Sequence, residues 1–211
     1  MKVYTFSKQE EIVHAVIHGI GAIFSIVAVV LLIIYASPDG DLWQIVSVTI
    51  FGSTMLLMYL SSTIVHSLPE GKWKGLFLIF DHACIYLFIA GTYTPFLLVH
   101  LRGKHGWILL CTVWGIALIG IVFKIFFAKK FIVLSTIGYI LMGWLIIIAW
   151  NPLTNMIHET GITLLVLGGV CYTIGTIFYL WRAFRFHHAV WHLFVLAGSS
   201  FHFFSIFYFV I

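Results

Sequence analysis

Charged side chains are scarce in this chain of 211 residues. Lys and Arg together number 11 and Asp and Glu number 7, so that 9% of the residues are charged, whereas 62% are hydrophobic. A soluble domain of ordinary composition carries roughly a quarter of its residues as charged side chains. The composition therefore excludes an ordinary soluble domain and predicts an integral membrane protein.

Cysteines are also few, and their number is odd. Cys84, Cys111 and Cys171 all fall within apolar stretches, so we expect buried free thiols and no disulfide framework. Ten-residue segments of alternating hydrophobicity are absent as well, which argues against a membrane β-barrel. Spanning segments without such strands must satisfy their backbone hydrogen bonds as helices.

What the chain does contain is apolar runs long enough to cross about 30 Å of hydrocarbon. The connections between them, such as SPDGD and NPLTNMIHE, are too short to form a separate folded domain. We therefore expect an all-α membrane protein in which residues 1–211 form one domain, a bundle of seven transmembrane helices. The seven predicted spans cover roughly residues 13–35, 43–66, 76–99, 106–127, 131–150, 160–181 and 189–211.

Basic residues are distributed unevenly between the connections. Two precede the first span, two follow the second, three follow the fourth and two follow the sixth, whereas only Arg102 and Lys104 fall on the opposite side. The positive-inside rule then predicts a cytoplasmic N-terminus and an extracytoplasmic C-terminus. The net charge of +4 is explained by this topology, and we expect no nucleic-acid partner.

One carboxylate and three imidazoles are predicted to lie at a common depth. Asp81 is the only one of the seven acidic residues inside a predicted span, about one and a half turns into the third helix. Ser62 and His66 are four residues apart at the end of the second helix, and His188 and His192 are four apart at the start of the seventh. Residues four apart share a helix face, and the topology brings all of these to one side of the membrane.

This combination of residue types is typical of hydrolytic zinc. Two histidines at i and i+4, with a third from another helix, form a three-ligand site whose fourth position stays open for water. Zinc would lower the pKa of that water to near 7. We expect His66, His188 and His192 as ligands, Asp81 to orient the water or take its proton, and Ser62 to donate a hydrogen bond to the developing oxyanion.

Two other interpretations of these residues stay open at this stage. Polar side chains in membrane helices also bond across helices or reach for the interface, without any metal. Alternatively, Ser62, His66 and Asp81 would form a Ser-His-Asp hydrolase, although two members on one helix at i and i+4 suit a supporting role at least as well.

Further polar residues fall near this predicted site. Glu11, His14 and His18 share one stripe of the first helix, either as partners that orient the metal ligands or as an interfacial polar stripe. His202 lies ten residues beyond His192, about 15 Å along the helix, which is too far for one metal to bridge them. We expect His202 to line a cavity or to bond across helices.

The remaining histidines carry no predicted chemistry. His82 and His187 are next to stronger candidates but are expected on different helix faces. His100, His105 and His158 are expected in external loops as ordinary surface residues.

The third helix contains a predicted irregularity. In GTYTPFLL, Gly91 and Pro95 predict a kink or an early end of the helix. A kink there would widen a cavity above Asp81.

Four stretches together resemble the hemolysin III family, the bacterial branch of the progestin and adipoQ receptor family. They are EEIVHAVIHGIGAIFSI, SSTIVHS, FDHACIYLFIAGTYTPFLL and HAVWHLFVLAGSSFHFF, and the resemblance covers essentially the whole chain. It implies seven helices with a cytoplasmic N-terminus in the bacterial plasma membrane. It also implies a zinc ion held by His66, His188 and His192, with Asp81 bonded to the zinc-bound water and Ser62 adjoining.

Three functions follow as alternatives. The adiponectin receptors of this family and the related alkaline ceramidases are thought to hydrolyse lipid amides, which favours a zinc-dependent hydrolase of lipid amides or esters acting within the bilayer. The family's name suggests a pore-forming or cytolytic protein instead. A structural zinc in a protein that senses membrane lipids is the third, and in each case the expected partner is a membrane lipid.

Overall fold

The computed structural model describes residues 6–38, 41–128 and 130–211. Seven helical segments in it are long and apolar enough to span a membrane, and the described residues contain no strand. The prediction of an all-α bundle with seven spans is therefore confirmed, whereas the side on which each terminus lies stays a prediction. Lys2 and Lys129, which entered the charge balance, lie outside the described residues.

The helices are α1 (Lys8–Ala36), α2 (Leu42–Ser67), α3 (Lys72–Pro95), α4 (Lys104–Phe127), α5 (Ile132–Gly143), α6 (Trp150–Met156), α7 (Glu159–Leu180) and α8 (His187–Phe209).

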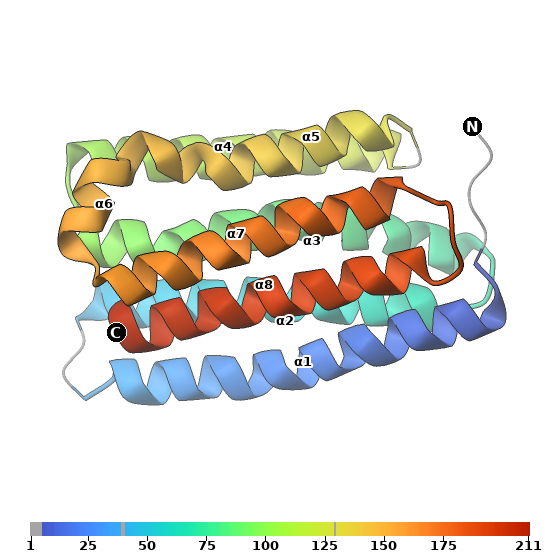
Figure 1. Ribbon diagram of the computed structural model, residues 1–211, viewed down its shortest axis with the longest axis horizontal. Helices are drawn as coiled ribbons and strands as arrows, with labels where there is room; N and C mark the ends of the chain where they lie inside the picture. Colours follow the sequence, from blue (N-terminus) through green and yellow to red (C-terminus); the bar gives the residue numbers. More distant parts are fainter. Residues whose placement is uncertain (1–5, 39–40, 129) are drawn as a thin grey trace.

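The helices run side by side along the long axis of the molecule (Figure 1). The helices α1, α2 and α8 pack together at one edge, α4 and α5 lie at the other, and α3 and α7 stand between them. Connections are short, so neighbours in sequence are mostly antiparallel neighbours in space. As a result the start of α1, the end of α2, and the starts of α3 and α8 meet at the same end of the bundle.

A capping box begins α1 and ties it to α8. The Ser7 hydroxyl accepts from the Glu10 backbone N–H at 3.3 Å, and the Glu10 carboxylate accepts from the Ser7 N–H at 2.9 Å. The same carboxylate accepts from the N–H of Phe186 at 3.2 Å, the residue just before α8. Arg185 also donates to the Gln9 side chain. These bonds hold the first turns of α1 and α8 together.

The opposite end of the bundle is joined by Asp41. Its carboxylate accepts from the Gln44 backbone N–H at 3.0 Å, which caps α2, and from the Arg102 guanidinium at 2.7 Å. The Gln44 N–H, and after it Arg102, hold the pKa of Asp41 below its usual value. Because both charged side chains are exposed, this pair stabilises the fold little.

The fifth span is longer and less regular than predicted. The helix α6 begins at Trp150, the last residue of the predicted span, and includes residues 151–156, which were expected in a loop; a 3-10 turn over residues 144–149 joins α5 to it. Pro152 does not break this helix because it lies in the first turn, where its missing N–H has no intrahelical partner to lose. The span therefore extends over Ile132–Met156.

Tyr93 of α3 supports the irregular part of the fifth span. Its hydroxyl lies 2.8 Å from the Met142 carbonyl and 2.7 Å from the Gly143 carbonyl, to which it donates, and it accepts from the Ile146 N–H at 2.9 Å. A side chain inserted into the backbone ladder in this way is a recognised cause of a helix break. The break thus has its cause in another helix.

The irregularity predicted at Pro95 is present. The helix α3 ends at this residue and passes into a π-helical turn over Phe96–His100. His100 lies in that turn, where it is half-buried with Nε2 3.2 Å from the Phe209 carbonyl. The expectation of a surface loop at His100 was therefore wrong, because the span continues through it.

Candidate metal centre

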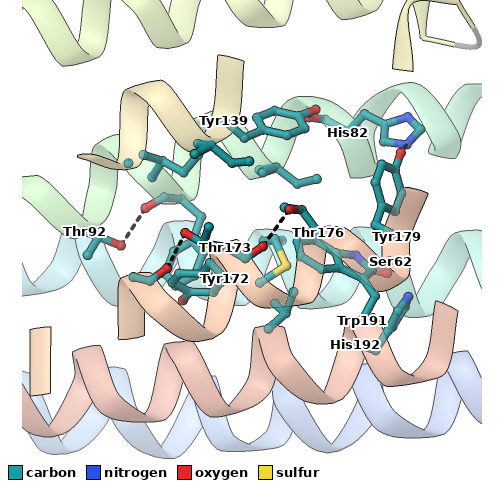
Figure 2. A pocket seen from close by; sticks show the side chains of 18 of the residues that line it. Ser62, His82, Thr92, Tyr139, Tyr172, Thr173, Thr176, Tyr179, Trp191 and His192 are labelled. Atoms are coloured by element: carbon teal, nitrogen blue, oxygen red, sulfur yellow. Dashed lines mark hydrogen bonds between the residues drawn. The ribbon is translucent and has the colours of Figure 1, made fainter. Parts of the chain in front are cut away.

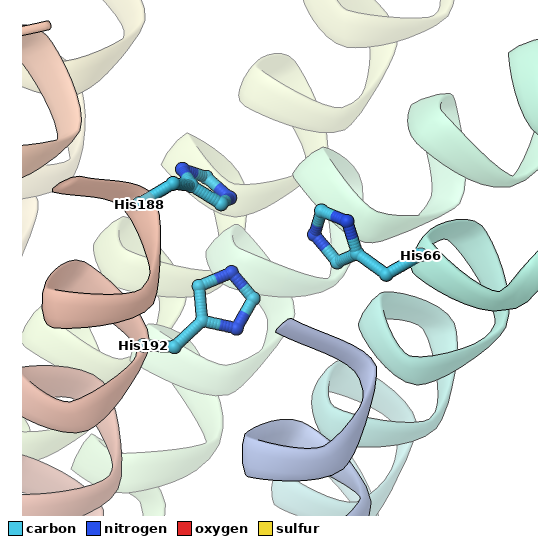
Figure 3. Close-up of side chains that lie close together, drawn as sticks. All are labelled: His66, His188 and His192. Carbon is cyan, nitrogen blue, oxygen red and sulfur yellow. The ribbon is translucent and has the colours of Figure 1, made fainter. Parts of the chain in front are cut away.

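Three histidines from two helices converge at the end of the bundle where α1 begins (Figure 3). His66 lies at the end of α2, and His188 and His192 lie in the first turns of α8. One ring nitrogen from each falls within 4.8 Å of the other two. Because ligand nitrogens on a tetrahedral zinc at 2.0–2.1 Å are roughly 3.4 Å apart, small side-chain rotations bring this set to one cation.

The surroundings of His66 fit a metal ligand. Its Nδ1 lies 2.6 Å from Oε2 of Glu11, and because an ionised carboxylate only accepts, Nδ1 carries the proton. This leaves Nε2 with the lone pair that a metal needs, and a carboxylate behind a metal-binding imidazole is the usual arrangement. Glu11 is itself held by Lys74, which donates to Oε1 at 2.6 Å. The donor set of three imidazoles thus fits zinc.

His14 and His18 lie against the same three rings. The His14 ring centre is 4.8 Å from that of His66, and the His18 ring centre is 3.6 Å from that of His192. His14 is fully buried and His18 is 3% exposed, and their ring nitrogens have no hydrogen-bond partner among the described residues. The stripe on α1 therefore faces the interior of the bundle and not its surface.

Asp81 and Ser62 lie near each other beside the three histidines. Asp81, on α3, interacts with the Ser62 hydroxyl, which is placed to donate to it, and it is an electrostatic neighbour of His66 and Lys124. Asp81, Ser62 and the three histidines line one common cavity. A carboxylate that can accept a proton thus faces the space beside the candidate ligands.

Lys124 was missed by the sequence analysis, which counted it as a charge of a connection. It lies in the last turn of α4 with no exposed surface, its Nζ is 5.8 Å from the centre of the Tyr139 ring, and it has no hydrogen-bond partner in the described chain. Its electrostatic partner is Asp81. The available signal was its position inside the predicted span 106–127, since a charge within a span is a functional candidate.

A cavity of about 250 Å³ leads away from this site (Figure 2). It begins at His66, Asp81 and the α8 histidines and continues between α3, α5, α7 and α8 as far as Phe96 and Trp150. Most of its lining is apolar, with hydroxyls from Thr92, Tyr172, Thr173 and Thr176 at intervals. Such a long apolar space with polar groups at one end suits an amphipathic molecule.

Besides the three candidate ligands, four described histidines line this cavity, namely His18, His82, His187 and His202. His202 does so and also bonds across helices, with Nε2 3.0 Å from the Leu165 carbonyl. His82 and His187, which were expected on different helix faces, are buried and also line the cavity. Nε2 of His82 lies 3.2 Å from the Tyr179 hydroxyl, and Nδ1 of His187 lies 3.0 Å from the Phe178 carbonyl. Both contacts are made with α7.

His105 and His158 are exposed, as expected, but His105 lies in a helix and not in a loop. His105 lies in the first turn of α4, and His158 caps α7 by accepting from the Thr160 N–H at 3.2 Å.

Phe6 covers the histidines at the end of the bundle. Its ring centre is 4.7 Å from that of His14 and 4.9 Å from that of His188. An aromatic ring in this position limits access of water to the site from that end.

Comparisons with known proteins agree with the sequence resemblance. A family model described as haemolysin-III related matches residues 6–203. The chain is 54% identical to the Hemolysin-3 homolog of Bacillus subtilis (strain 168), over 98% of this chain and 97% of the relative. It is 52% identical to Hemolysin-3 of Bacillus cereus, over 96% and 93% of the two chains. The human monocyte to macrophage differentiation factor is 27% identical over 80% of this chain and 72% of its own. No solved structure matches.

Proposed function

The chain belongs to the haemolysin-III related family, and from this premise we propose that it is a zinc-binding membrane protein that hydrolyses a lipid amide or ester. The observation that carries the proposal is the convergence of His66, His188 and His192 beside Asp81 at one end of a mainly apolar cavity. A ligand set, a proton acceptor and a space for an acyl chain are thereby adjacent.

The three histidines would hold the zinc, with Glu11 fixing the tautomer of His66. Bound there, zinc supplies a Lewis acid that polarises a carbonyl and lowers the pKa of water. Asp81 accepts the proton of the attacking water and returns it to the leaving amine or alcohol. Ser62 orients the Asp81 carboxylate, and Lys124 balances its negative charge.

The cavity supports a substrate that has an apolar tail. Its lining beyond the histidines is formed by side chains such as Phe88, Ile140 and Val195. Burying apolar surface there contributes about 25 cal/mol per Å². The carbonyl would lie at the histidines and the tail would extend towards Trp150, as expected for a lipid drawn from the surrounding bilayer.

The topology belongs to the same proposal. With the N-terminus in the cytoplasm and the C-terminus outside, the site lies in the cytoplasmic part of a bundle that residues 1–211 form as one domain. The Bacillus relatives favour the plasma membrane of a bacterium as its location.

Cytolysis is a second candidate, because two relatives bear the name Hemolysin-3 or Hemolysin-3 homolog. A water-filled pore needs a continuous polar lining. The cavity is mainly apolar, which favours a lipid over an ion path. A sensor of membrane lipids with structural zinc would use the same cavity without turnover.

Lipid product analysis tests the proposal. Wild type and Asp81→Asn are reconstituted in vesicles that contain ceramide or diacylglycerol, and released fatty acid is measured. We expect product from wild type only, with equal zinc content in both proteins. Equal turnover in the two proteins would refute hydrolysis through Asp81, and ion leakage that persists after zinc removal would support the cytolytic alternative.

A further inference from the structure

One basic side chain lines the cavity. Among the described residues that line it, Arg182 is the one lysine or arginine and Asp81 is the one acidic residue. Arg182 lies in the connection from α7 to α8, beyond Leu180, where α7 ends. A guanidinium stays protonated at any pH that a cell reaches. The polar end of the cavity therefore carries a permanent positive charge that the proposed reaction does not use.

Tyr179 relates Arg182 to the candidate metal centre. The Tyr179 ring centre lies 5.8 Å from that of His188, and Tyr179 stands at the same end of the cavity as His192 (Figure 2). Arg182 follows three residues later, which is at most about 11 Å of chain, and it is an electrostatic neighbour of Tyr179. Arg182 therefore lies close to the metal centre, on the side where the chain leaves the bundle.

Trp181 and Phe184 place Arg182 at the membrane interface. Trp181 is 57% exposed and Phe184 is 40% exposed, and their ring centres lie 6.1 Å apart. Exposed aromatic rings at the ends of spans lie at the level of the lipid headgroups. The charge of Arg182 is thus at the depth of a headgroup, whereas the cavity extends inward from it as far as Trp150.

We propose that Arg182 binds an anionic group, a carboxylate or a phosphate, on the polar part of the ligand. The planar guanidinium matches both groups because it can donate two parallel hydrogen bonds to either. The preferred ligand is then an acyl amide or ester with an anionic headgroup a few bonds from its carbonyl. This inference rests on the proposed function and names the substrate class of the same site.

Arg185, in the same connection, has a different role. It donates to the Gln9 side chain and lies over the Phe186 ring, 4.9 Å from the ring centre. Arg185 is not among the described residues that line the cavity. The two arginines carry the same charge and lie three residues apart, so a comparison between them separates binding in the cavity from attraction to a positive surface.

The test uses two probes that share a tail and an amide. N-palmitoylglycine ends in a carboxylate, and N-palmitoylethanolamine ends in a neutral hydroxyl. Binding of each radiolabelled probe is measured on purified, zinc-loaded, full-length Asp81→Asn protein, which should hydrolyse neither. We expect a preference of roughly three- to tenfold for the glycine probe, the effect of one charged pair that water partly screens. 1-Palmitoylglycerol and its 3-phosphate form a second pair, which tests phosphate in place of carboxylate.

Adding Arg182→Gln should remove the preference, whereas adding Arg185→Gln should leave it unchanged, with equal zinc content in both proteins. No preference in either pair of probes would overturn the inference, as would a preference that persists in Arg182→Gln, because the metal itself would then attract the anion. Equal losses in the two arginine variants would also overturn it, since they would show attraction to the surface alone.

Two further outcomes concern the proposed function. Failure of all four probes to bind would overturn both the ligand cavity and the role of Arg182. An Arg182-dependent preference together with no release of glycine from N-palmitoylglycine by wild type would support the anion site and count against hydrolysis.

Discussion

Glu11 lies between His66 and Lys74 and bonds to both at 2.6 Å, one through each carboxylate oxygen. The three residues belong to α1, α2 and α3, so one carboxylate fixes the relative position of three helices at the candidate metal centre. It also fixes the proton of His66 on Nδ1. Charge and hydrogen bonding at Glu11 should therefore control the quality of His66 as a ligand.

Replacing Glu11 by Gln keeps the shape of the side chain and removes its charge. We expect zinc affinity to fall roughly 10- to 100-fold, the usual effect of losing a group that supports a metal ligand. Chelator competition on purified protein measures it. Glu70→Gln is the matched control, because Glu70 also contacts Lys74, at 3.4 Å, but is largely exposed and is not bonded to His66. Equal losses in both variants would contradict the role given to Glu11.

Lys124 should matter for turnover and not for metal binding. Lys124→Met removes the buried ammonium that balances Asp81, and we expect lipid hydrolysis to fall on the order of tenfold, the effect of about 1.4 kcal/mol on the barrier. Zinc content should not change, and Lys124→Arg should restore part of the rate. The exposed Lys130, just beyond α4, gives the control Lys130→Met. Loss of zinc in Lys124→Met would show that Lys124 acts through folding instead.

The residues brought together by topology were predictable from the sequence. His188 and His192 share a face because of the helical period, and the number of crossings places the end of α2 beside the start of α8. Neither inference needs side-chain detail. The span count follows in the same way from apolar length alone.

Rotation of a helix about its axis was harder to predict. In a bilayer the outer face of a bundle is as apolar as its core, so hydrophobicity gives little information on which face packs inward. Hence the inward direction of His14 and of Lys124 emerged only from the packing of α1 and α4. The helix over Trp150–Met156 was missed because Asn151 and Pro152 are typical of turns, yet they also fit a first helical turn.

A larger side chain halfway along the cavity should shorten the acyl chain that fits. Thr92 is buried, lines the cavity, and lies eleven residues along α3 from Asp81, or roughly 16 Å. Thr92→Phe should reduce turnover of long-chain substrates more than tenfold relative to short-chain ones, because misfit at the site raises the barrier by more than 1.4 kcal/mol. Thr112→Phe on the exposed face of α4 is the control, since both threonines bond only to a carbonyl one turn back. Equal effects on long and short chains would contradict the proposed path of the tail.

Glu10 links the start of α1 to the residue that precedes α8, and that residue is conformationally unusual. Phe186 has φ of 63°, a left-handed conformation that costs a non-glycine residue roughly 1–2 kcal/mol. Its N–H donates to the Glu10 carboxylate, and this bond helps to hold the conformation of Phe186. The same bond thereby helps to set the direction of the first turn of α8, which carries His188. Glu10→Ala removes both this bond and the capping box, so we expect a loss of about 1 kcal/mol in stability together with weaker zinc binding.

Glu159→Ala, at the exposed start of α7, removes a first-turn acid without any such link and should leave zinc binding unchanged. Thermal unfolding and chelator competition on both variants decide the matter, and a Glu10→Ala protein that keeps full zinc affinity would exclude α1 from the positioning of α8.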